Sequence, residues 1–163
     1  TGVQTCTLPI LVNANGNGVG NIGTSGAYFN TVFAKATSAQ YADLAENYQA
    51  DSDYTPGTVV IFGGTAEITL TSEQADERVA GVISENPAHL MNSGMDGLAV
   101  ALRGRVPVRV IGPVVKGDSL VTSATAGAAE SVGRSRDYGQ AVFAKAIETN
   151  LDSGEKTIVA VIL

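Results

Sequence analysis

Few side chains of this chain could carry out covalent or metal-assisted chemistry. His89 is the only histidine and Cys6 the only cysteine, so a Ser-His-Asp or Cys-His mechanism would have to use His89. No Gly-x-Ser-x-Gly elbow is present to expose a nucleophilic serine. Cys6 and His89 also lack the paired spacing of zinc ligands. We therefore expect His89 to be a loop residue fixed by packing or hydrogen bonds, and we expect no metal site and no cofactor.

A glycine pattern near the N-terminus formally matches the fingerprint of dinucleotide-binding folds. Residues 18–23 read Gly-Val-Gly-Asn-Ile-Gly, and Asp43 follows twenty residues later. That fold needs a strand that runs into the first glycine and a helix that begins there. The residues before the pattern are Asn-Ala-Asn-Gly-Asn and those after it are Thr-Ser-Gly, so neither element is expected. We expect a structural turn instead of a dinucleotide site.

The acidic residues between positions 51 and 78 fit exposed turns better than binding sites. Asp51-Ser-Asp53 could begin a calcium loop, but an EF-hand needs Gly at its sixth position and Glu at its twelfth. The chain has Pro56 and Phe62 there. Residues 73–78 are likewise expected to form an exposed, charged connection.

The distribution of charge argues against nucleic acid as a partner. The formal net charge is −6, and Lys and Arg occur singly, so no basic stripe can neutralise consecutive phosphates. Arg103, Arg105 and Arg109 form the densest basic cluster. We expect them to form salt bridges between subunits or to face solvent, not to bind an anion. The run at residues 157–163 is far shorter than the ~20 apolar residues that span a bilayer, so no membrane insertion is expected.

The elements that must position these residues are strands. Hydrophobic residues make up 44% of the chain, and its many Val, Ile and Thr residues favour strands over helices. Gly, Pro and Asn recur at short intervals between runs rich in Val and Ile, which is typical of an all-β fold, a compact antiparallel barrel or sandwich. The predicted strands cover residues 58–62, 67–70, 79–84, 98–102, 106–111, 120–122, 141–147 and 157–163.

Some details of the strand arrangement follow from residue spacing. Val106, Val108 and Val110 share one face by period-two alternation. Pro107 places their strand at an edge or a bulge, because proline cannot donate to the ladder. Residues 150–154, Asn-Leu-Asp-Ser-Gly, indicate a hairpin loop of about five residues, so the last two strands are predicted to pair. Residues 41–48 are compatible with a short helix or with a strand.

The first forty residues differ in composition from the rest. Residues 13–26 are so rich in Gly and Asn that a regular element is not expected. Tyr28, Phe29, Val32 and Phe33 follow, with more apolar surface than a free linker leaves in water. We predict a fibre-like, oligomerising segment at 1–40, with these four residues at the interface between subunits, and a β-domain at 41–163. The start at Thr1 and the strand-like end suggest the C-terminal piece of a longer protein.

Four stretches resemble the join between fibre and terminal domain in phage appendage proteins, at residues 21–46, 54–64, 79–87 and 104–118. Within the first, Ser-Ala-Gln-Tyr-Ala-Asp at 38–43 is similar to the cleavage motif Ser-Ala-Asp-Tyr-Ala-Glu of glutamic-type intramolecular chaperone domains, which end some phage neck appendages and tailspikes. In that family the domain guides trimer folding and cuts itself off near the motif with an Asp and a Glu. The resemblance places these roles at Gln40 and Asp43.

The resemblance implies a structural virion protein, the terminal domain of a tail fibre or appendage. We expect it to form a homotrimer, to contact other virion proteins in the virion, and to have host surface polysaccharide as a candidate partner. Gln40 departs from the family, because an amide cannot shuttle a proton as a carboxyl can, so we expect no enzymatic activity. Two alternatives stay open. One is a self-cleaving chaperone peptidase. The other is a carbohydrate-binding fibre tip, which would need an exposed aromatic platform in a chain without Trp.

Overall fold

The computed structural model describes residues 20–24, 26–31, 33 and 42–163. The chain divides into two units, Thr1–Thr37 and Ser38–Leu163. In the first unit, the described residues include a tight turn, in which Thr24 and Ala27 exchange backbone hydrogen bonds of 3.0 and 3.1 Å. Gly23 precedes this turn with a φ of +86°, a conformation that glycine adopts at little cost. The predicted site residues Val32 and Gln40 lie outside the described residues.

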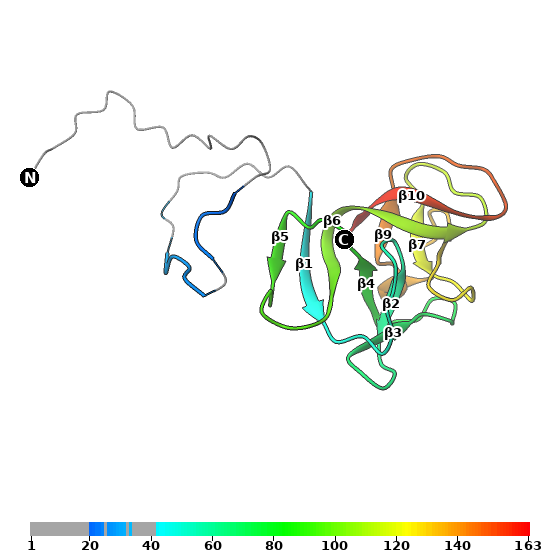
Figure 1. Cartoon of the computed structure of the whole chain (residues 1–163). Coiled ribbons are helices and arrows are strands. Elements are labelled where there is room, and N and C mark those ends of the chain that lie inside the picture. The colour runs from blue at the N-terminus through cyan, green and yellow to red at the C-terminus, as the bar shows by residue number, and fades with distance from the viewer. Residues whose placement is uncertain (1–19, 25, 32, 34–41) are drawn as a thin grey trace, which may run out of the picture. The chain divides into compact units, whose positions relative to one another are not determined.

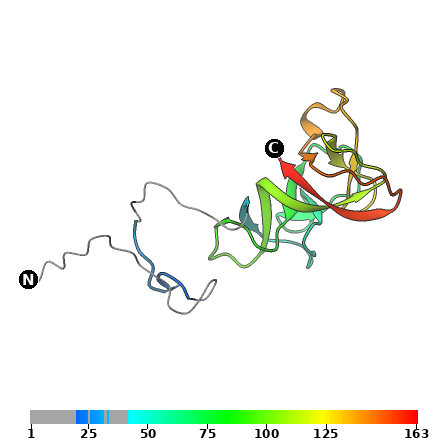
Figure 2. The same cartoon turned by 90° about the horizontal axis from the view of Figure 1, so that it is seen from above.

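The second unit is all-β and contains a closed barrel (Figure 1). Five strands form the closed ring, each hydrogen-bonded to the next: β6 (Leu98–Ile111), β10 (Glu155–Ile162), β9 (Ala144–Ala146), β7 (Ser119–Thr122), β8 (Ala129–Ser131) and β6 again. Neighbours in the ring are antiparallel except β6 and β8. Figure 2 shows β6 in green and β10 in red as long strands, which pair with each other. The expectation of an all-β barrel is confirmed, and so is the pairing of the last two strands.

Five further strands extend the sheet from β6. They are β4 (Val79–Ile83), β2 (Val59–Phe62), β3 (Ile68–Leu70), β1 (Asp43–Tyr48) and β5 (His89–Met91). β1 pairs antiparallel with β6 and parallel with β5. Burial alternates along β1, with Asp43, Ala45 and Asn47 buried, so the segment that was compatible with helix or strand is a strand. The part of the chain that the structure describes has no α-helix, only a short 3₁₀ turn, η1 (Gly139–Ala141).

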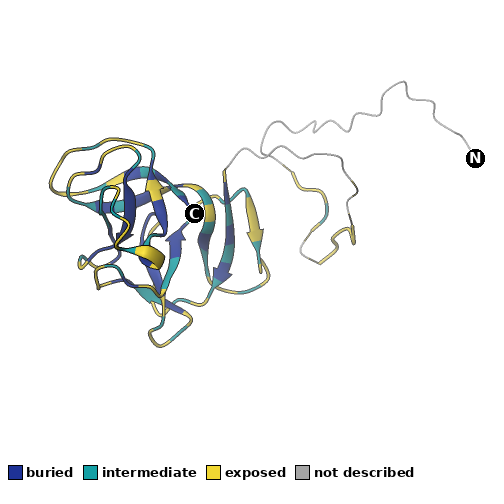
Figure 3. Cartoon of the chain, turned by 180° about the vertical axis from the view of Figure 1, so that it is seen from behind, coloured by how far each residue is buried: buried dark blue, intermediate teal, exposed yellow. Residues whose placement is uncertain are grey.

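The core is built from branched aliphatic side chains. Val106, Val108 and Val110 are all buried and belong to one cluster with residues of β7, β9 and β10, as their alternation predicts. Complete burial of such a side chain stabilises the fold by up to about 1.5–3 kcal/mol. A second cluster, Val60, Ile68, Ile83 and Val100, lies where β2, β3, β4 and β6 meet. Figure 3 shows the buried strand faces in dark blue and exposed loops and β5 in yellow.

The position of Pro107 differs from the prediction of an edge or a bulge. β6 is a central strand, and β10 pairs with it from Gly104 to Ile111. On the other side, the Arg105 N–H donates to the Ala42 carbonyl at 3.1 Å and the Arg109 N–H donates to the Gly57 carbonyl at 2.8 Å. Alternate residues of a strand direct their N–H groups to the same side, so Pro107 leaves a gap between these two bonds. Proline is tolerated there because no neighbour needs its N–H.

Candidate functional site

Asp43 is the one residue of the predicted catalytic pair that the structure describes, and the close packing of β1 on β6 fixes its position. Asp43 pairs with Gly104 of β6, whose φ is +108°. A Cβ atom at Gly104 would overlap the carbonyl oxygen of Ala42 and lie 2.8 Å from the Asp43 Cα. Only glycine therefore allows β1 to begin this close to β6.

A hollow of about 230 Å³ opens beside the start of β1, next to the gap at Pro107. We call it the Asp43 pocket, and its lining residues are Ala42, Asp43, Ser84, Glu85, Asn86, Arg105, Val106 and Pro107. Two backbone hydrogen bonds fix the loop between β4 and β5 at its ends: the Ser84 N–H donates to the Ala99 carbonyl at 2.8 Å, and the Ala88 N–H donates to the Asp43 carbonyl at 2.9 Å. The frame of the pocket is thus held by main-chain bonds.

The carboxylate of Asp43 is the unusual group in this pocket. Asp43 is only 6% exposed, and its Oδ2 atom has no hydrogen-bond partner among the described residues. In that part of the chain it is the one buried side-chain nitrogen or oxygen atom in this condition. A buried acceptor without a donor costs about 1–3 kcal/mol, and more when it is charged. This oxygen is also closed to solvent, so its burial lowers the stability of the fold.

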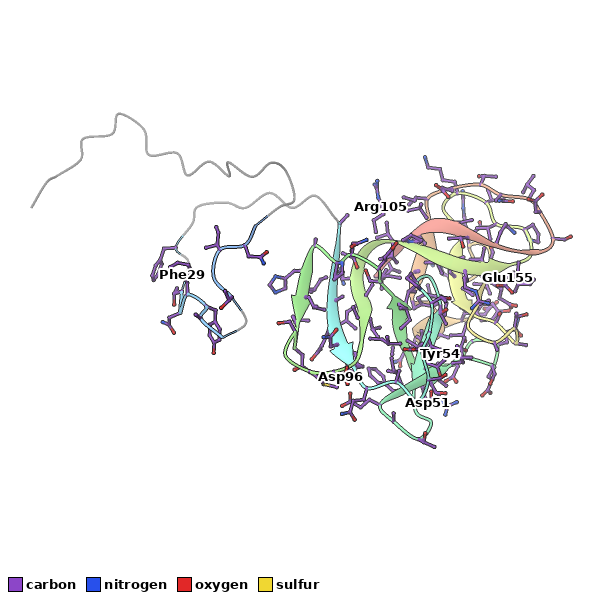
Figure 4. All side chains as sticks on the ribbon, in the orientation of Figure 1. Phe29, Asp51, Tyr54, Asp96, Arg105 and Glu155 are labelled. Carbon is purple, nitrogen blue, oxygen red and sulfur yellow. The ribbon has the colours of Figure 1, made fainter. Side chains whose placement is uncertain are left out.

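Exposed polar side chains line the same hollow as Asp43. Glu85, Asn86 and Arg105 are exposed, and no ion pair or side-chain hydrogen bond joins them to another described residue. Figure 4 shows Arg105 near the start of β1. Arg109, which lies four residues further along β6 on the same side, instead pairs with Glu155 of β10 at 2.6 Å. The sequence led us to expect salt bridges between subunits or exposure to solvent. Arg103 and Arg105 are exposed, whereas Arg109 pairs within the chain.

The pocket brings together two carboxylates that the sequence did not relate. Asp43 and Glu85 are 42 positions apart, yet both line the hollow. Two carboxyl groups can act as general acid and general base when one is protonated and the other ionised. Glu85 was missed because only the pairing of β1 with β5 and β6 brings its loop to Asp43. The sequence feature that could have indicated Glu85 is its position directly after the predicted strand at residues 79–84.

The structure also places the other residues that the sequence singled out. Tyr28, Phe29 and Phe33 are 79%, 65% and 96% exposed, and Figure 4 shows the Phe29 side chain in the first unit. His89 begins β5 and is exposed, so it is a strand residue and not the loop residue that we expected.

A larger hollow, of about 460 Å³, lies elsewhere on the second unit. Its acidic lining residues are Asp53 and Asp96. Beside it, the carboxylate of Asp51 accepts a hydrogen bond from the Tyr54 hydroxyl, which lowers the pKa of Asp51 below its usual value (Figure 4). Within the described ranges, no three His, Cys, Asp or Glu side chains are grouped to hold a metal ion.

We predicted that residues 73–78 form an exposed connection, and this is only partly correct. Asp76 is buried, and its carboxylate accepts hydrogen bonds from the Arg78 side chain at 2.7 and 3.0 Å. The Asp76 N–H donates to the Thr122 hydroxyl at 2.7 Å. Hydrogen bonding from Arg78 lowers the pKa of Asp76 below its ordinary value. Asp76 therefore has a structural role, because it connects this loop to β7 by a hydrogen bond.

No protein-family model matches the chain, and no curated protein matches it significantly. In the described residues, no helix combines the length and apolarity needed to cross a bilayer.

Proposed function

We propose that the chain is a structural part of a phage virion, the terminal β-domain of a tail fibre or appendage, which assembles as a homotrimer. One observation carries the proposal: Ile22, Tyr28, Phe29 and Phe33 are between 65% and 96% exposed. These four side chains lie within twelve residues of the chain, and monomeric soluble proteins seldom leave a large contiguous apolar patch exposed. Burial between subunits would gain about 25 cal/mol for each Å² of apolar surface. The all-β barrel that follows fits a terminal domain.

Light scattering coupled to gel filtration tests this proposal on the intact chain. The expected mass is that of a trimer at micromolar concentration. The variant Phe33→Ala should shift the chain towards monomer, because Phe33 contributes exposed apolar area to the interface. Leu151→Ala is the matched control, since Leu151 is 68% exposed on the barrel and should leave the mass unchanged. A monomeric parent protein would refute the proposal, as would an equal response to both variants.

The self-cleaving chaperone is the second candidate, and the pocket gives it one supporting observation. Asp43 and Glu85 line the same hollow, so Glu85 could supply the second carboxyl group that Gln40 lacks. Intact mass after prolonged incubation, in a chain extended upstream of Thr1, decides between the candidates. We expect no cut, neither in the parent nor in Glu85→Gln, whereas a cut that Asp43→Ala or Glu85→Gln abolishes would establish the peptidase. A cut seen only in Gln40→Asp would show that the site has the geometry for cleavage and that the parent lacks only the carboxyl group at position 40.

A further inference from the structure

The loop between β5 and β6 contains the single Asp-Gly pair of the chain, Asp96-Gly97. The fold requires glycine at position 97, because an added Cβ atom would overlap the carbonyl oxygen of Tyr48. Glycine thus allows β6 to begin directly against the end of β1, where Leu98 pairs with Tyr48. The same glycine leaves the amide nitrogen that follows Asp96 without a side chain beside it.

From this geometry we propose that Asp96-Gly97 is a site of spontaneous covalent modification, at which aspartate converts to isoaspartate through a succinimide ring. The Gly97 amide nitrogen attacks Cγ of Asp96. A new N–Cγ bond forms, and the carboxyl OH leaves with the amide hydrogen as one water. Water then reopens the ring: cleavage at Cγ restores aspartate, whereas cleavage at the main-chain carbonyl carbon gives isoaspartate. This goes beyond the assembly role, and it does not depend on trimer formation.

Neither of the two reacting groups is held elsewhere by the fold. Asp96 and Gly97 are both exposed, and Asp96 lies near the end of β1 (Figure 4). Among the described residues, the Asp96 carboxylate joins no ion pair and the Gly97 N–H donates no backbone hydrogen bond. Asp96 also lines the larger hollow of about 460 Å³, so its side chain has room to rotate towards the Gly97 nitrogen.

The fold protects a comparable pair, Asp118-Ser119. The Asp118 carboxylate accepts hydrogen bonds from the Val115 N–H at 2.9 Å and from the Ser131 hydroxyl at 2.6 Å. The Ser119 N–H donates to the Gly133 carbonyl at 2.7 Å, and Asp118 and Ser119 are both buried. Because carboxylate and amide are each bonded elsewhere, we expect Asp118 to react only after unfolding.

A second pair, Asp152-Ser153, separates the effect of exposure from the effect of glycine. Both of its residues are exposed, as Asp96 and Gly97 are. Ser153, however, carries a Cβ atom next to the attacking nitrogen, and the Asp152 N–H donates to Asn150 Oδ1 at 3.1 Å. We therefore expect Asp152 to react more slowly than Asp96 in the folded chain.

The modification would act on the pairing of β1 with β6. Isoaspartate carries the main chain through its Cβ and Cγ atoms, so it lengthens the backbone by one atom just before Leu98. Leu98 and Tyr48 form the last pair of the ladder between these strands. The longer backbone should therefore loosen this end of the sheet.

Incubation of the intact chain at neutral pH in water labelled with heavy oxygen tests the proposal, because each reopening of the ring introduces one oxygen atom from water. Peptide mapping by mass spectrometry locates the label. The protease Asp-N identifies the product, since it cuts before aspartate but not before isoaspartate. Residues 15–18 contain two Asn-Gly pairs, which also form succinimides, and the mapping separates them from Asp96. We expect more label and more isoaspartate at Asp96 than at Asp152, and none at Asp118.

Asp96→Glu is the matched control, because it keeps the charge at an exposed position but would have to form a larger ring. It should abolish the label at position 96 and leave the label at Asp152 unchanged. In urea, Asp118 should become labelled as well, since the hydrogen bonds that hold it are lost. The proposal is overturned if the folded parent gains neither label nor isoaspartate at Asp96, if Asp152 or Asp118 reacts as fast as Asp96 in the folded chain, or if Asp96→Glu is labelled as strongly as the parent.

Discussion

Replacement of Gly104 by alanine tests the close approach of β1 to β6, on which the Asp43 pocket depends. Gly104 has a φ of +108°, and an added Cβ would overlap the Ala42 carbonyl oxygen and lie 2.8 Å from the Asp43 Cα. The backbone strain of an L-residue at positive φ costs about 1–2 kcal/mol. Forcing an atom into packed backbone adds about 1–3 kcal/mol. Gly104→Ala should therefore lower the free energy of unfolding by about 2–5 kcal/mol.

Gly112→Ala is the matched control, because Gly112 has a φ of +78° and nothing lies within 4 Å of an added Cβ. Gly112→Ala should lose only the free energy that backbone strain costs, so the free energies of unfolding of the two variants should differ by about 1–3 kcal/mol. Urea unfolding measures both, and each kcal/mol corresponds to about 2–4 °C in Tm for a chain of this size. Amide exchange at Arg105, whose N–H donates to Ala42, should accelerate only in Gly104→Ala. Equal losses in the two variants would show that β1 does not begin against Gly104.

Two further predictions concern the stability of the barrel. Hydrogen bonds from Arg78 lower the pKa of Asp76. The stability that Asp76 contributes is therefore fully present above its unfolded pKa of about 4, and it is lost as the pH falls through its pKa in the folded protein. Asp76→Asn should therefore be less stable than the parent at neutral pH, and the difference should shrink in urea titrations below about pH 4; a constant difference would contradict the pairing. Leu120 is fully buried, so Leu120→Ala should lower the free energy of unfolding by about 2–5 kcal/mol. The exposed control Leu151→Ala should change it by less than about 0.5 kcal/mol. Similar losses in the two variants would contradict the burial of Leu120.

Local pattern was sufficient for most of the strands. Branched residues bounded by Gly and Pro located β2, β3, β4, β7 and β10 to within two residues, because side-chain alternation and turn residues act over a few positions. The same reasoning missed β5 and β8, which have three residues each and little alternation. It also divided β6 at Gly104, since a glycine in a strand is as compatible with a break as with a close approach by another strand.

The sequence alone therefore determined the fold class, the face that carries Val106, Val108 and Val110, and Asp43 as a candidate. The tertiary structure decided the rest. It closed the barrel through the pairing of β6 with β10, placed Pro107 inside the sheet, and brought Glu85 into a pocket with Asp43. The physical reason is distance along the chain. Periodicity reports which face of a strand is buried, whereas the partner of a strand depends on packing between segments that can be tens of residues apart.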